Sequence, residues 1–99
     1  MTLREKQSTF ARMLAYLIIW ADDHGYQLTL GDAYRDKRVP YGHPRSFHRK
    51  RLAIDFNLFK GGKYMRTTEA HKPLGEYWES IGGSWGGRWG DGNHYSLGE

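Results

Sequence analysis

The segment Leu52–Phe59, LAIDFNLF, decides the fold because its residues alternate between the two faces of a β-strand. Successive side chains of a strand point to opposite sides of the sheet. One face is entirely apolar and consists of Leu52, Ile54, Phe56 and Leu58. The opposite face carries small and polar side chains: Ala53, Asp55 and Asn57. A carboxylate on this uncrowded face makes Asp55 a candidate functional residue, although a solvent-facing side chain is the ordinary interpretation.

An amphipathic helix is expected near the start of the chain. Apolar residues recur at helical spacing across Phe10–Ala21, Thr2 and Glu5 have the spacing of a capping box, and Gly25 suits a helix C-terminus. The apolar run Met13–Ala21 is too short to span a bilayer. The capping residues favour a core helix over a secretion signal.

The remaining elements predict a small α+β domain with an antiparallel sheet and flanking helices. A strand is expected from Tyr26 into Ala33–Arg35, followed by a polar loop over Asp36–Lys50. A short helix is expected over Pro73–Ile81, with the proline in its first turn, and a last strand over Asn93–Leu97. The length predicts one domain, residues 1–99.

Composition restricts the chemistry and the partners. The chain has no cysteine, so disulfides and thiolate metal sites are excluded, and His, Asp and Glu are the strong metal ligands that remain. Fifteen Lys and Arg against eleven Asp and Glu give a net charge of +4. This charge favours anionic partners such as nucleic acid, a membrane surface or a cell-wall polymer. The basic loop that contributes to it carries Arg38, Arg45, Arg49, Lys50 and Arg51.

His48, Asp55 and His94 form the candidate metal-ligand set. Two imidazoles and one carboxylate leave a zinc ion one open coordination position for water. Asp91, three residues before His94, is a candidate general base toward that water. His48 would lie about 20 Å from Asp55 along a straight strand, so a shared metal requires the chain to bend near Arg49–Arg51. Each residue also has an ordinary surface interpretation, and the spacing alone leaves both open.

A glycine-rich approach precedes His94. Residues 82–92 hold six glycines and two tryptophans, Trp85 and Trp89. Glycine allows close backbone approach and bends that other residues disfavour. The two indoles either cap the core or form the wall of a cleft that holds an extended polymer.

The combined pattern resembles the zinc-dependent M15 peptidases, which include D-alanyl-D-alanine carboxypeptidases and the L-alanyl-D-glutamate endopeptidases of bacteria and phages. Ser46–His48 followed by Ala53–Asp55 resembles the first family motif, and Asp91 three residues before His94 resembles the second. Trp85–Trp89 is similar to the tryptophan-glycine stretch that precedes this ending in phage endolysins.

The resemblance implies a Hedgehog/D-Ala-D-Ala peptidase-like fold and one bound zinc ion. The zinc ligands it implies are His48, Asp55 and His94. Asp91 matches the catalytic acid/base position. Arg35 matches the arginine of the family's Tyr-Arg element, which would bind the substrate and help neutralise the oxyanion. Ser46 would contact the substrate or brace the site.

Two features depart from the family pattern. Arg51 stands where many members have glycine, so we expect the approach to the strand to be reshaped. The chain is also shorter than most members, which predicts trimmed loops and a more open cleft. Neither departure removes a proposed ligand.

The expected function is cleavage of peptidoglycan stem peptides by a phage endolysin at the L-Ala–D-Glu bond. A D-Ala-D-Ala carboxypeptidase is the alternative within the enzyme class. A basic nucleic-acid-binding module, or a non-catalytic relative that binds zinc or cell wall, is the alternative outside it. We expect peptidoglycan as the partner in place of nucleic acid, a monomer, and no stable membrane insertion. The expected location is the host cytoplasm until a holin gives access to the wall.

Overall fold

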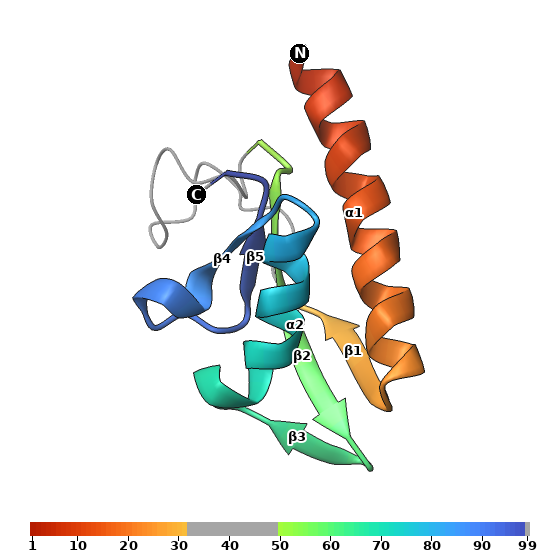
Figure 1. The fold of residues 1–99 in the computed structure, drawn as a ribbon, viewed down its shortest axis with the longest axis vertical. Helices are drawn as coiled ribbons and strands as arrows, with labels where there is room; N and C mark the ends of the chain where they lie inside the picture. Colours follow the sequence, from red (N-terminus) through yellow and green to blue (C-terminus); the bar gives the residue numbers. More distant parts are fainter. Residues whose placement is uncertain (32–49, 99) are drawn as a thin grey trace.

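The computed structural model describes residues 1–31 and 50–98. A five-stranded antiparallel sheet packs against two helices (Figure 1), which confirms the expected α+β class. In chain order the elements are α1 (Leu3–Asp23), β1 (Tyr26–Leu30), β2 (Ala53–Lys60), β3 (Lys63–Met65), α2 (Thr68–Ser80), β4 (Ser84–Trp85), the 3-10 helix η1 (Gly86–Trp89) and β5 (His94–Ser96).

Helix α1 begins and ends where its capping residues predict. The Thr2 hydroxyl accepts a hydrogen bond from the Glu5 backbone N–H at 3.1 Å, and the Glu5 carboxylate accepts one from the Thr2 N–H at 3.0 Å. This reciprocal capping box satisfies two backbone donors that a helix start leaves unpaired. Gly25 follows the helix with a φ of +83°, a left-handed conformation that glycine adopts readily.

Strand β2 is the centre of the sheet and pairs antiparallel with three neighbours. β1 and β3 pair with its second half, and β5 pairs with its first half. β4 then extends the sheet beyond β5. The register places Ile54 opposite Tyr95 and Asp55 opposite His94. The pairing of β2 with β5 therefore places a core contact, Ile54 with Tyr95, next to a candidate site contact, Asp55 with His94.

The core lies on the face of β2 that the apolar alternation predicts. Trp78 of α2 is fully buried there, with its ring edge-on to Phe10 of α1 at 5.8 Å and to Tyr95 of β5 at 6.1 Å between centroids. Its indole N–H donates to the Ser96 carbonyl at 2.8 Å. The buried apolar cluster consists of Phe10, Met13, Leu17, Ala21, Leu52, Ile54, Phe56, Leu58, Leu74, Trp78, Trp85 and Tyr95.

The predicted start of the second helix was wrong. α2 begins at Thr68, and Pro73 lies inside it instead of in its first turn. Thr67 is the N-cap, and its hydroxyl accepts the Ala70 N–H at 3.1 Å. Pro73 has no N–H to donate to the preceding turn, which ordinarily disfavours a helix interior. The Thr67 cap and the burial of Leu74 offset that loss.

A buried polar pair connects α2 to β5. His71 is 2% exposed, and its Nδ1 lies 2.8 Å from the Tyr95 hydroxyl. Burial lowers the pKa of His71 to about 4, because a charged imidazolium is disfavoured away from water. Burial likewise raises the pKa of the Tyr95 phenol above its usual range. His71 is thus neutral in the folded protein near pH 7, and its imidazole belongs to the core through its contact with Tyr95.

Within the ranges that the structure covers, no helix has both the length and the apolar character needed to cross a bilayer.

The His71 pair predicts an acid-sensitive fold. In the unfolded chain His71 regains its ordinary pKa of 6.5, so the unfolded state binds more protons between pH 6.5 and 4. The stability is therefore fully present above pH 6.5 and is lost as the pH falls, by about 3 kcal/mol at most. Urea unfolding of wild type and His71→Gln across this window measures it. We expect the wild-type free energy of unfolding to fall more steeply; parallel curves would contradict the assignment.

Candidate functional site

Asp55 and His94 lie directly opposite each other on β2 and β5. Their side chains leave the sheet on the face opposite Ile54 and Tyr95, which are buried in the core. Asp55 Oδ1 and His94 Nδ1 are 3.4 Å apart, and the two side chains are 20% and 7% exposed. The fold therefore brings together two of the three predicted metal ligands in a largely buried setting.

Backbone hydrogen bonds fix this pair from both neighbouring strands. The Phe56 N–H donates to the Asn93 carbonyl at 2.9 Å, which holds the start of β5 against β2. On the other side of β2, the Gly31 N–H donates to the Asp55 carbonyl at 2.7 Å. A side chain at Gly31 would place its Cβ 2.9 Å from that carbonyl oxygen, so glycine permits the approach. The backbone of Asp55 is thus held between two strands.

Asp91 is exposed and lies at the start of a tight turn into β5. Its carbonyl accepts the His94 N–H at 3.2 Å, and its own N–H donates to the Gly86 carbonyl at 2.9 Å. The Gly92 N–H donates to the Thr68 hydroxyl at 3.2 Å, which ties the turn to the start of α2. The backbone that carries the predicted general base is therefore anchored to His94, to η1 and to α2.

The two tryptophans of the glycine-rich segment have different roles. Trp85 is 3% exposed, and its indole N–H donates to the Gly92 carbonyl at 2.7 Å, so it belongs to the core. Trp89 is 54% exposed, and its ring centroid lies 6.1 Å from that of His94. Trp85 therefore caps the core, as one sequence interpretation expects, whereas a cleft wall at Trp89 stays a prediction. Sequence reasoning missed β4 and η1 because glycine-rich segments have no apolar periodicity.

Three of the predicted site residues lie outside the described residues: Arg35, Ser46 and His48. The same holds for Arg38, Arg45 and Arg49 of the basic loop. Among residues 1–31 and 50–98, no group of three or more His, Asp or Glu side chains forms a metal site. Of the three predicted metal ligands, this part of the chain contributes Asp55 and His94.

A bend precedes β2 at the place where shared ligation requires one. Lys50 and Arg51 form a turn, and Arg51 has a φ of +57°. A left-handed conformation costs a residue with a side chain about 1 kcal/mol or more, whereas glycine adopts it freely. Arg51 thus keeps a backbone conformation that suits the glycine of many family members. The Gln7 side-chain amide holds the turn by donating to the Lys50 carbonyl at 2.9 Å.

The donor set of the pair fits a zinc ion. Two ligands that each lie about 2.0–2.1 Å from zinc in tetrahedral geometry are about 3.3–3.4 Å from each other. The 3.4 Å between Asp55 Oδ1 and His94 Nδ1 matches this separation. An imidazole nitrogen and a carboxylate oxygen are also ligand types that zinc accepts.

Comparison with known families decides the broad class. The family described as D-alanyl-D-alanine carboxypeptidase, in the M15 peptidases, matches residues 41–97, more than half of the chain. The chain belongs to the M15 peptidase family. It is thus a hydrolase, a peptidase of the D-alanyl-D-alanine carboxypeptidase type, in a family that is generally zinc-dependent. No curated protein matches the chain.

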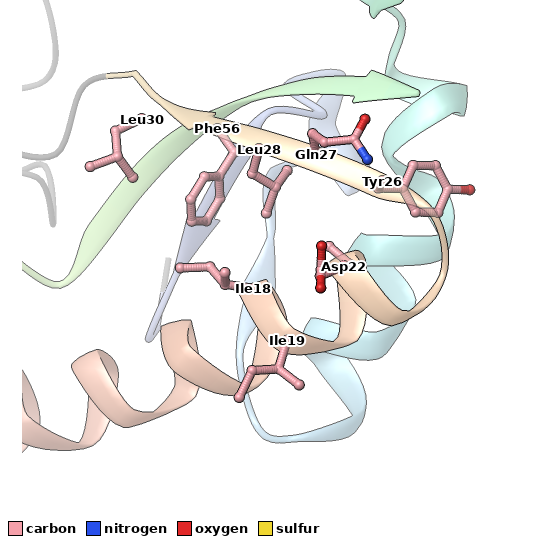
Figure 2. A pocket seen from close by; sticks show the side chains of 9 residues that line it. Ile18, Ile19, Asp22, Tyr26, Gln27, Leu28, Leu30 and Phe56 are labelled. Atoms are coloured by element: carbon pink, nitrogen blue, oxygen red, sulfur yellow. The ribbon is translucent and has the colours of Figure 1, made fainter. Parts of the chain in front are cut away.

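The M15 peptidase also has a groove between the C-terminal half of α1 and β1, with a volume of about 390 Å³ (Figure 2). Its lining is mainly aliphatic and aromatic, and Asp22 is the one carboxylate among the residues that line it. Leu28 and Phe56 lie on the core side of the sheet, opposite the face that carries Asp55. The groove lacks the polar groups that hydrolysis needs, so the candidate active site of the peptidase is the Asp55–His94 face.

Gly86 is predicted to be essential for the shape of this site. A Cβ there would lie 2.3 Å from the Asp91 carbonyl oxygen and 2.8 Å from the His94 Cβ. We expect Gly86→Ala to cost about 1–3 kcal/mol of stability and to lower peptidase activity, because the turn and β5 must separate.

Gly90→Asn is the matched control in the same loop. Gly90 has a φ of +84° with open space around it, and asparagine tolerates that conformation. Thermal unfolding and peptidoglycan hydrolysis of both variants test the assignment. Equal behaviour of the two variants would show that crowding at Gly86 is unimportant.

Proposed function

We propose that this M15 peptidase is a zinc-dependent endolysin that cleaves the L-Ala–D-Glu bond of peptidoglycan stem peptides. The observation that carries the metallopeptidase assignment is the contact of Asp55 and His94 across two strands, with Asp91 anchored on the turn into His94. The endolysin assignment is supported by the similarity of Trp85–Trp89 to the tryptophan-glycine stretch of phage enzymes. Gly86–Trp89 of that stretch forms η1, and the ring centroids of Trp89 and His94 are 6.1 Å apart.

The metal would be held by Asp55 and His94 together with His48. When bound, zinc supplies Lewis-acid polarisation of the peptide carbonyl and favours ionisation of water near neutral pH. The low exposure of Asp55 and His94 restricts competition from bulk water for these donors. Their positions on paired strands give the ligands a rigid support.

Asp91 would move the proton. Its carboxylate takes a proton from water as the water oxygen bonds to the scissile carbonyl carbon. The same carboxylic acid then returns the proton to the amide nitrogen as the C–N bond breaks, which leaves a carboxylate and a free amine. The exposure of Asp91 allows it to reach both water and substrate, while its anchored backbone limits the reorganisation needed.

Arg35 and Ser46 complete the proposed site. The Arg35 guanidinium would donate hydrogen bonds to the oxyanion that develops on the carbonyl oxygen, and Ser46 would contact the substrate or brace the site. The net charge of +4, with Lys50 and Arg51 exposed at the turn before β2, favours the carboxylate-bearing stem peptide over a neutral polymer. Access to the wall would depend on a partner such as a phage holin.

The second candidate is a D-Ala-D-Ala carboxypeptidase, which the activity of the matching family favours. The two reactions leave different products. Endopeptidase cleavage exposes the amino group of D-glutamate, whereas the carboxypeptidase releases free D-alanine. Digestion of purified peptidoglycan, followed by identification of the new amino termini, distinguishes them. Release of D-alanine without new D-glutamate termini would contradict the endopeptidase proposal.

Asp91→Asn is predicted to separate catalysis from metal binding. The amide keeps the size of the side chain but cannot accept the proton, so we expect kcat to fall by about 10²–10⁴-fold with zinc content unchanged. Asp22→Asn, an exposed carboxylate on α1, is the control and should retain activity. Turnover on peptidoglycan and metal content by mass spectrometry give the two readouts. Loss of zinc in Asp91→Asn would instead make Asp91 a metal ligand.

A further inference from the structure

We propose that Trp89 is a substrate-binding residue that stacks on the sugar attached to the stem peptide. The preferred substrate is then a stem peptide still linked to its glycan, in place of the free peptide. This inference rests on the proposed function, because it assigns a role to Trp89 at the same site. Its evidence is the exposure of the ring, the anchoring of its backbone and its distance from His94.

Packing among residues 1–31 and 50–98 does not account for the position of the Trp89 ring. Trp85, four residues earlier, fills the core and hydrogen-bonds through its indole N–H. Trp89 leaves 54% of its surface exposed, and its indole makes no hydrogen bond to a residue in the part of the chain that the structure describes. An exposed large apolar ring loses the burial that ordinarily stabilises tryptophan. A ligand that covers the ring would restore this stabilisation by burying the indole.

The backbone on both sides of Trp89 is anchored. The Arg88 guanidinium donates two hydrogen bonds to the Glu79 carboxylate of α2, at 2.9 and 2.6 Å, and lies 5.3 Å from the centre of the Trp85 ring. On the other side, Gly90 ends η1 in a left-handed conformation, and its carbonyl accepts the Thr68 hydroxyl at 3.4 Å. The ring is thus presented from a supported segment, which lowers the entropy lost when it binds a ligand.

The position of the ring selects the part of the substrate that it meets. The ring centroids of Trp89 and His94 are 6.1 Å apart, a distance that two residues of extended chain can bridge. In a substrate cut between L-Ala and D-Glu, the group on the amino side of L-Ala is the lactyl-linked muramyl sugar. An indole offers a flat apolar face with a polar edge, which complements the C–H face and the hydroxyl rim of a pyranose ring.

The diamino acid of the stem peptide is the competing contact. Its ammonium group could lie over the indole face through a cation–π interaction. The net charge of +4 disfavours a further cation, whereas a neutral sugar meets no such repulsion. The observations therefore favour the neutral sugar.

The test compares kcat/KM on two substrates, a disaccharide tetrapeptide and the same tetrapeptide without sugar. We expect Trp89→Ala to lower the ratio of kcat/KM on the disaccharide tetrapeptide to kcat/KM on the free tetrapeptide about tenfold. The cause is a higher KM for the disaccharide tetrapeptide, and Trp89→Phe should restore part of the ratio. Tyr16→Ala, an aromatic residue of α1 that is 49% exposed, is the matched control and should leave the ratio unchanged. Circular dichroism verifies that each variant is folded.

Two results would overturn the proposal. An unchanged ratio in Trp89→Ala shows that the ring does not contact the sugar, and an equal loss of kcat/KM on both substrates assigns the ring to the peptide that they share. If wild type cleaves neither substrate, the proposed function fails, and binding then decides the role of Trp89. Titration with the disaccharide linked to L-alanine, followed by NMR, should show about tenfold weaker affinity in Trp89→Ala; equal affinities, or no binding to wild type, overturn it.

Discussion

The antiparallel pairing of β2 with β5 is the constraint on which the candidate site depends. Asp55 and His94 are far apart in the sequence, and the register alone brings Oδ1 and Nδ1 to 3.4 Å. A slip of β5 by one residue would turn His94 toward the core and away from Asp55, because strand side chains alternate between faces. The adjacent pair of Ile54 and Tyr95 prevents this slip, since both are buried against the helices. The hydrophobic core thus determines the geometry of the polar site.

The glycine-rich segment after α2 uses the same pairing for a second purpose. It contributes β4 to the sheet and then folds back as η1. Asp91 and Trp89, which are close to His94 in the sequence, are thereby anchored around it. Close packing explains its composition, because a Cβ at Gly86 or Gly87 would overlap the Asp91 backbone or the Trp85 ring. The segment therefore links the core, through Trp85, to an exposed aromatic side chain at the site.

Local patterns were sufficient to predict some of the elements and not others. α1 and β2 were predictable because a capping box and a period of two act over neighbouring residues. The start of α2 was missed because Pro73 is typical of a first turn, while the Thr67 cap lies further upstream. The contact of Asp55 with His94 depends on long-range pairing, so spacing alone left it open and the family resemblance supplied it. The different roles of Trp85 and Trp89 depend on tertiary packing, which a single sequence does not encode locally.

We propose above that Asp55 and His94, with His48, hold one zinc ion. Metal content of the purified protein, measured by mass spectrometry for wild type, His94→Ala and the remote His24→Ala, tests it most directly. His24 lies at the end of α1, where its imidazole Nδ1 is 2.7 Å from the Trp20 carbonyl, so it controls for the loss of any histidine. We expect about one zinc per chain in wild type and His24→Ala, and loss of zinc in a folded His94→Ala. A wild type that takes up no zinc, or a His94→Ala variant that keeps it, would contradict the proposed zinc site.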